Sequence, residues 1–169
     1  MDIPRSARHY KPAMRLALFE PDIPPNTGTI LRLAACLGIP VDIIEPCGFP
    51  FSERGFRRAG MDYLELVALA RHSSLETFEA ARRKSGARLI LMTTKAETAY
   101  TEFSFADNDV ILVGRESSGV PDRVHEAADA RLLIPIIAET RSLNVAMAAA
   151  MVLGEALRQT RKFPQKDPV

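Results

Sequence analysis

The chain has 169 residues, of which 47% are hydrophobic and 25% charged, and its formal net charge is +1. This length and composition are typical of one soluble domain with a full hydrophobic core. No apolar run approaches the ~20 residues of a membrane-spanning helix. The near-neutral charge excludes binding of nucleic acid or membranes through bulk charge, so any such surface must be a local patch.

Short apolar runs alternate along the chain with helical patterns. In chain order we expect a strand at 15–19, a helix at 27–37, a strand at 41–45, a helix at 53–59, a strand at 64–67, a helix at 74–84, strands at 88–92 and 109–113, a helix at 121–128, a strand at 131–134 and a long final helix at 143–161. Strands that are apolar throughout are typical of parallel sheets covered on both faces. The sequence therefore predicts an α/β fold with a parallel sheet, in a single domain over 1–169 whose ordered core is about 14–160.

Several residues predict where the helices begin and end. Asn26 is expected to be the N-cap of the first long helix, and Gly38 ends it. Ser73 or Ser74 is expected to cap the next long helix, which ends at Gly86.

The first long helix carries one unusual residue. Arg32 is the only charged residue between Thr27 and Leu37. Arginine is rarely buried unless it is paired. We therefore expect Arg32 either to pair with a hidden carboxylate or to point into a site, and both alternatives stay open here.

Three predicted strands are followed by polar or glycine-rich loops, at 93–95, 114–119 and 135–144. Ligands of open parallel sheets bind beyond the carboxyl ends of the strands. Each loop alone is consistent with a simple turn, but the three together predict a ligand site. The chain has no G-x-G-x-x-G motif after a strand and no Walker lysine loop, which excludes a typical Rossmann dinucleotide site or a P-loop.

The remaining reactive side chains give weaker signals. His9, His72 and His125 lack metal-ligand spacing, and we expect His72 and His125 to be solvated. Cys36 and Cys47 also lack it, so we expect no metal site and a reducing, cytoplasmic location.

The segment 52–63 contains three arginines and two aromatic residues. Such a segment is either a solvated helix face or a patch that contacts RNA phosphates and stacks on bases. The final helix is rich in alanine and almost without a polar face, so we expect the domain core or a second subunit to cover it.

Five segments resemble, in order, motifs of the SPOUT class of RNA methyltransferases. Three are general to the class, namely 24–32 (PPNTGTILR), 114–121 (GRESSGVP) and 134–144 (IPIIAETRSLN). Two more, 44–49 (IEPCGF) and 57–63 (RRAGMDY), are similar to the TrmL (YibK-like) branch of tRNA wobble-position 2′-O-methyltransferases. The resemblance covers about 15–159. It implies an α/β SPOUT domain with a C-terminal trefoil knot, a homodimer, S-adenosylmethionine as cofactor, and tRNA as substrate, methylated on the ribose of the cytidine or uridine derivative at position 34.

The resemblance also assigns residues. The implied S-adenosylmethionine pocket is Met92, Thr93, Gly114, Glu116, Gly119, Ile134, Ser142 and Leu143, and the implied catalytic residues are Arg32, Asn26, Ser142 and Asn144. Arg57, Arg58 and Tyr63 are implied to contact tRNA. Because a guanidinium stays protonated, we expect Arg32 to orient a phosphate and stabilise alkoxide charge, including across a dimer interface. The proton acceptor stays open.

One departure bears on the target. Relatives carry an aromatic residue just before the glutamate that matches Glu155, where this chain has Gly154. A methyltransferase for another tRNA or rRNA nucleotide therefore stays an alternative. A non-catalytic dimer that binds S-adenosylmethionine or RNA is a second one, which the presence of the implied site residues disfavours.

Overall fold

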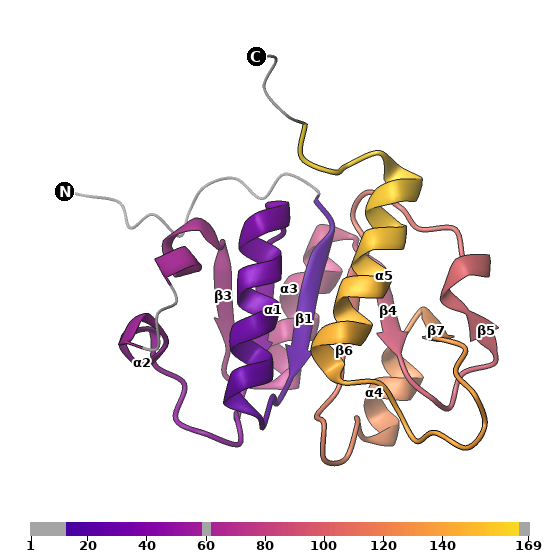
Figure 1. Ribbon diagram of the computed structural model, residues 1–169, viewed down its shortest axis with the longest axis horizontal. Helices are drawn as coiled ribbons and strands as arrows, with labels where there is room; N and C mark the ends of the chain where they lie inside the picture. Colours follow the sequence, from indigo (N-terminus) through magenta and orange to yellow (C-terminus); the bar gives the residue numbers. More distant parts are fainter. Residues whose placement is uncertain (1–12, 59–61, 166–169) are drawn as a thin grey trace.

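The computed structural model of the chain describes residues 13–58 and 62–165 (Figure 1). In chain order the elements are β1 (Arg15–Phe19), α1 (Pro24–Leu37), β2 (Val41–Ile44), α2 (Glu53–Arg58), the 3₁₀ helix η2 (Asp62–Leu66), β3 (Leu69–His72), α3 (Leu75–Ser85), β4 (Leu89–Met92), β5 (Thr98–Ala99), the 3₁₀ helix η3 (Tyr100–Glu102), β6 (Val110–Val113), α4 (Asp122–Ala127), β7 (Ala130–Leu133) and α5 (Val145–Thr160).

The strands form one seven-stranded sheet in the order β3-β2-β1-β6-β4-β7-β5. Every described strand pair is parallel, which confirms the predicted α/β class. Side chains alternate between the two faces. Leu16 and Leu18 of β1 pack in the core beneath α1 and α5, whereas Ala17 and Phe19 pack on the other face with residues of α3 and α4. Two apolar layers thus cover the sheet on both faces.

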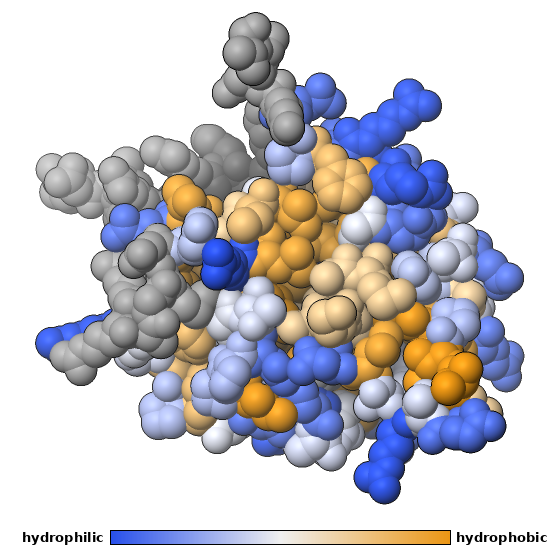
Figure 2. Space-filling view, viewed as in Figure 1, coloured by the Kyte–Doolittle hydropathy of each residue, from blue (hydrophilic) through white to orange (hydrophobic). Residues whose placement is uncertain are grey.

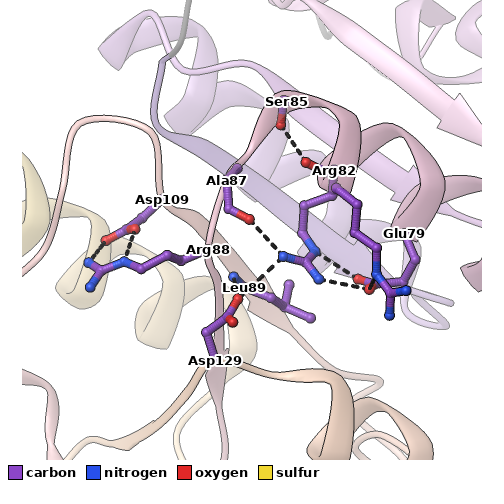
Figure 3. Close-up of polar contacts among 9 residues, drawn as sticks. Glu79, Arg82, Ser85, Ala87, Arg88, Leu89, Asp109 and Asp129 are labelled. Atoms are coloured by element: carbon purple, nitrogen blue, oxygen red, sulfur yellow. Dashed lines mark hydrogen bonds and ion pairs between the residues drawn. The ribbon is translucent and has the colours of Figure 1, made fainter.

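Paired charges anchor α3 at the amino edge of the sheet (Figure 3). Arg82 donates to both carboxylate oxygens of Glu79, at 2.9 and 2.8 Å, and to the carbonyl of Ala87, at 2.6 Å. Arg88 donates to both carboxylate oxygens of the fully buried Asp109, at 2.8 and 2.7 Å. These contacts lie at the edge opposite the strand-end loops and serve the fold.

The predicted strand at 64–67 is wrong. That segment belongs to η2 and the turn after it, with Leu64 and Val67 as its buried residues, and the strand follows as β3. Buried residues three apart match the 3₁₀ repeat rather than strand alternation. β5 and η3 were not predicted, because elements of two or three residues carry no periodic signal.

The predicted N-cap of α1 is also wrong. Ile23 is the N-cap, without a side-chain cap bond, and prolines occupy the first two helical positions. Proline has no N–H to satisfy, so the helix needs less capping. Asn26 lies inside the first turn, and its side chain is available for other contacts. The predicted helix ends at Gly38 and Gly86 are confirmed, and Ser74 caps α3.

His72 is not on the surface as expected. It lies in β3, and its Nε2 atom is 2.8 Å from the Oδ1 atom of Asp42, whose side chain is 1% exposed. Asp42 also accepts two hydrogen bonds from Arg15, at 2.6 and 2.9 Å. Burial opposes the charge of Asp42, but the hydrogen bonds from His72 and Arg15 outweigh it and lower the pKa of this carboxyl.

Candidate active site

A cavity of about 560 Å³ lies at the carboxyl edge of the sheet. Its walls come from the last residues of β4, β6 and β7, from the loops that follow them, and from the first turns of α1 and α5. Small-molecule sites occupy roughly 300–1,000 Å³. The cavity therefore has the size and the position expected of a ligand site in an open parallel sheet.

All eight residues that the resemblance assigned to a cofactor pocket line this cavity. They are Met92, Thr93, Gly114, Glu116, Gly119, Ile134, Ser142 and Leu143. Of the four implied catalytic residues, Asn26 and Asn144 line it as well as Ser142, which belongs to both sets. The structure thus brings together side chains from the start of α1 and from three loops.

The loop after β6 is a tight turn that requires glycine. Arg115 and Gly119 exchange backbone hydrogen bonds of 3.1 and 2.8 Å. A Cβ atom on Gly114 would lie 2.8 Å from the carbonyl carbon of Gly119 and 2.9 Å from a methyl of Val120. Gly119 has φ +67°, a conformation that side chains rarely adopt. The backbone therefore approaches the cavity closely at this loop.

Three side chains from distant parts of the sequence form a hydrogen-bond chain along the cavity wall. Asn144 caps α5 by accepting the backbone N–H of Ala146 at 2.8 Å. Its Nδ2 atom donates to Oδ1 of Asn26 at 3.0 Å. The Nδ2 atom of Asn26 donates to Oε1 of Glu116 at 3.2 Å. The chain fixes the two amides relative to each other.

Two neighbouring carboxyl groups lie at the end of this chain. The backbone N–H of Glu116 donates to Oδ1 of Asp22 at 3.2 Å, and the hydroxyl of Ser117 donates to Oδ2. A side-chain hydrogen bond with Glu116 lowers the pKa of Asp22 to about 2. Burial, together with that hydrogen bond, raises the pKa of Glu116. The two groups are therefore driven toward opposite protonation states.

Arg32 lies outside the cavity lining. Its side chain is exposed on α1, and its guanidinium carbon lies 5.0 Å from the ring centroid of Tyr63. This geometry is a cation–π contact. Among the described contacts Arg32 therefore pairs with a ring rather than with a hidden carboxylate, and it does not line the cavity of its own chain. The contact joins two residues that the resemblance had assigned separately, to catalysis and to tRNA.

The structure does not describe the side chains of the other implied tRNA contacts. They are Arg57 and Arg58, the last two residues of α2.

Two residues near the cavity differ from what the sequence predicts. His125, expected to be solvated, is half-buried and lines the cavity with Lys95. Asp22 was missed, because an acidic residue between two prolines resembles an ordinary loop residue.

The described residues, 13–58 and 62–165, were searched for metal sites and for membrane-spanning helices. Within these ranges no group of three or more His, Cys, Asp or Glu side chains could hold a metal ion. No helix there combines the length and the apolar character that crossing a membrane requires.

Comparisons with known proteins agree with this geometry. The SpoU rRNA Methylase family model matches residues 13–154. The chain is 62% identical over 144 residues, 85% of its length and 90% of the relative's, to a tRNA (cytidine(34)-2′-O)-methyltransferase of Beijerinckia indica subsp. indica.

Two solved structures are also similar. One, described as giving structural insights into the 2-OH methylation of C/U34 on tRNA, is 39% identical, with a TM-score of 0.80 over 88% of this chain and 97% of that one. The other is an AdoMet-bound rRNA methyltransferase from Sinorhizobium meliloti, 28% identical, with a TM-score of 0.80 over 92% of this chain and 60% of that one.

Proposed function

Since this chain belongs to the SpoU rRNA methylase family, we propose that it is an S-adenosylmethionine-dependent methyltransferase acting on tRNA. The proposed acceptor is the ribose 2′-oxygen of the cytidine or uridine derivative at position 34. Relatives that share 62% and 39% of the aligned residues carry the name of this activity. The identity extends over most of each chain, so the comparison concerns whole proteins.

The observation that carries the proposal is the composition of the cavity. Its lining joins the three strand-end loops with the first turns of α1 and α5. A side chain at Gly114 would clash with Gly119 and Val120 of the same loop, so bare backbone lines this part of the cavity. Apolar walls come from Ile134 and Leu143, and polar groups from Thr93 and Ser142. This mixture fits a nucleoside joined to an amino acid.

The chemistry demands alignment and charge stabilisation. When bound, S-adenosylmethionine supplies an activated methyl group. Ser142 and the amides of Asn26 and Asn144 would orient the acceptor in the cavity. Preorganised N–H donors stabilise negative charge that develops on an attacking oxygen, and both amides have N–H groups at the wall.

We place Arg32 at the cavity of a second copy of the chain. Arg32 is exposed and stacked on Tyr63 rather than lining its own cavity. Figure 2 shows apolar side chains gathered on the face that α1 and α5 present, and Met147 and Met151 of α5 are 60% and 41% exposed. A homodimer through this face would cover the methionines and allow Arg32 to reach a substrate held by the partner. Tyr63, Arg57 and Arg58 would contact the tRNA beside it.

Two further properties belong to the same proposal. The C-terminal part of the domain is proposed to be threaded as a trefoil knot, with the segment 134–144 passing beside the loop 114–119. Both segments line one cavity, which supports their close packing. A tRNA substrate is consistent with the cytoplasm as the location.

A direct assay tests the activity. The protein is incubated with total tRNA and methyl-labelled S-adenosylmethionine, and the RNA is digested to nucleosides. We expect label in 2′-O-methylcytidine and 2′-O-methyluridine derivatives. Label confined to methylated bases, or absent from RNA, would contradict the proposal.

A further inference from the structure

The two carboxyl groups beside the cavity, Asp22 and Glu116, share a geometry that two carboxylates cannot satisfy. The backbone N–H of Glu116 donates to Oδ1 of Asp22 at 3.2 Å, and a side-chain hydrogen bond between the two groups shifts the pKa of both. Ionised carboxylates have only acceptor oxygens, so a hydrogen bond between them requires a proton. The Oε2 atom of Glu116 is buried and has no hydrogen-bond partner among the described residues. A proton on this atom would give it Asp22 as its acceptor.

The surroundings decide which carboxyl group holds the proton. Asp22 accepts from the backbone N–H of Glu116 and the hydroxyl of Ser117, and the Nε atom of Arg115 lies 3.7 Å from its Oδ2. All three favour a charged Asp22. Glu116 accepts the neutral amide of Asn26 and its own backbone N–H, and no charged donor bonds it among the described residues. The proton therefore belongs on Glu116.

The other charged groups nearby do not reverse this assignment. Arg115 also pairs with Glu20, at 3.2 Å, so its charge is divided between two carboxylates. Lys95 and His125 line the cavity, but neither forms a hydrogen bond to Glu116 among the described contacts. The raised pKa of Glu116 and the lowered pKa of Asp22 agree with the assignment.

A protonated Glu116 completes a hydrogen-bond chain of fixed direction. The helix cap occupies Oδ1 of Asn144, so this residue must donate to Asn26 through Nδ2. Asn26 must then donate to Glu116, which accepts through Oε1 and donates through Oε2 to Asp22. Both asparagine oxygens already accept a hydrogen bond, and each amide keeps a second N–H that the chain does not use. Such donors suit an oxygen on which negative charge develops.

We propose that Asp22 is a positioning residue of this site, which holds one proton on Glu116 and thereby anchors the Glu116 carboxyl group at the end of the Asn144–Asn26–Glu116 hydrogen-bond chain. The inference rests on the proposed function for the identity of the ligand. The shared proton is a property of the chain without ligand, and can be tested separately.

The first experiment follows the carboxyl carbons by ¹³C NMR as pH is varied, with no ligand present. In the wild-type chain, Glu116 is expected to titrate above the ordinary glutamate value of 4.5. In Asp22→Asn its midpoint falls, because the like charge is gone and an amide N–H can bond a Glu116 carboxylate. Asp122→Asn, at an exposed position in the first turn of α4, is the matched control and leaves the midpoint in place. A wild-type midpoint at the ordinary value, or one that Asp22→Asn does not lower, would overturn the proposal.

A second measurement covers the case in which Asp22→Asn does not fold. Glu116→Gln keeps one donor and one acceptor and imitates the protonated form. Because the folded state raises the pKa of Glu116, it binds more protons than the unfolded state above pH 4.5. The unfolding equilibrium of the wild type therefore shifts toward the unfolded state relative to Glu116→Gln as pH rises, by up to about tenfold per pH unit. An equal pH dependence in both chains would overturn the proposal.

A third measurement links the shared proton to the cavity. S-adenosylhomocysteine is the probe, because it lacks the sulfonium charge that an ionised Glu116 would attract. Its affinity for the wild type, measured by calorimetry, is expected to fall by up to about tenfold per pH unit above the Glu116 midpoint. Asp22→Asn should lose most of this dependence. A flat wild-type affinity through the midpoint would refute the positioning role. Absence of binding at every pH, with Glu116 titrating as expected, would instead refute the proposed function and leave the shared proton intact.

Discussion

At the scale of single residues, Asn26 contributes to the site although local sequence rules predict that it caps a helix. An asparagine just before an apolar helix is usually an N-cap. Here Pro24 and Pro25 begin α1 without a side-chain cap. The amide of Asn26 instead forms hydrogen bonds with Asn144, 118 residues away in the sequence, and with Glu116, 90 residues away. Such a use depends on contacts that no local pattern encodes.

Arg32 is the residue whose proposed role is most readily separated from folding. Arg32→Ala removes an exposed cation–π contact and should leave the fold and the affinity for S-adenosylmethionine unchanged within about threefold. We expect the methyl-transfer rate to fall by roughly 10²–10³-fold, as when a preorganised charge donor is lost. Single-turnover kinetics with calorimetry measures both. Arg32→Lys keeps the charge but not the planar fork, and should recover only part of the rate. Transfer by Arg32→Ala at the wild-type rate would remove Arg32 from the mechanism.

Gly114 tests the tight turn at the cavity. Gly114→Ala places a methyl group 2.8 Å from the backbone carbonyl carbon of Gly119. Overpacking of this kind costs about 1–3 kcal/mol, so the affinity for S-adenosylhomocysteine should fall by about tenfold or more. Gly154→Ala is the control, because a Cβ there meets nothing within 4 Å. Equal affinities of the two variants would contradict the assigned geometry.

At the scale of elements, the strands buried on both faces were predictable and the irregular connections were not. β1 and β6 are apolar at most positions, and their ends agree with the prediction within one residue. The segment around Leu64 also contains leucine and valine, but it folds as a 3₁₀ turn that packs against α1 and α2. The strand-end loops could be located because the fold class fixes where ligands bind. Asp22 could not, because its role comes from Glu116, 94 residues away.

The Arg15–Asp42–His72 cluster holds β1, β2 and β3 together. Asp42→Asn removes a buried negative charge that faces two basic groups, and should destabilise the fold by about 3–5 kcal/mol. Urea unfolding measures this loss, with the exposed Asp122→Asn as control. Because the folded state lowers the pKa of Asp42, its contribution is complete above the ordinary value of 3.8 and declines as pH falls below it. The difference between wild type and Asp42→Asn should therefore shrink in acid. A difference that is constant from pH 6 to pH 3 would contradict this account.

The end of α2 tests the predicted tRNA contact. Reversing Arg57 and Arg58 to glutamate should weaken tRNA binding and reduce its dependence on salt, because fewer phosphates are neutralised. Arg83 and Lys84, exposed in the last turn of α3, give a control with the same change in net charge. Filter binding at several salt concentrations distinguishes the two pairs. Equal losses would assign the effect to net charge alone.

At the scale of the whole molecule, the proposed dimer explains why Arg32 lies apart from the cavity of its own chain. The cavity opens at the sheet edge, while Arg32, Met147 and Met151 are exposed on the α1 and α5 side. Met151→Glu places a charge in the proposed interface and should yield monomers in sedimentation equilibrium. Its methyl-transfer rate should fall although its own cavity is intact. A Met151→Glu chain that stays dimeric would place the interface elsewhere, and an active monomer would show that each chain carries a complete site.

The central claim is that the ribose at tRNA position 34 receives the methyl group. Its most direct test compares synthetic tRNAs that differ by one oxygen: an all-ribose tRNA with cytidine at position 34, the same tRNA with 2′-deoxycytidine at 34, and a control with a single deoxyribose at position 32. We expect equal transfer of labelled methyl to the first and the third, and none to the second. Transfer to the 34-deoxy tRNA at the rate of the all-ribose tRNA would contradict the account.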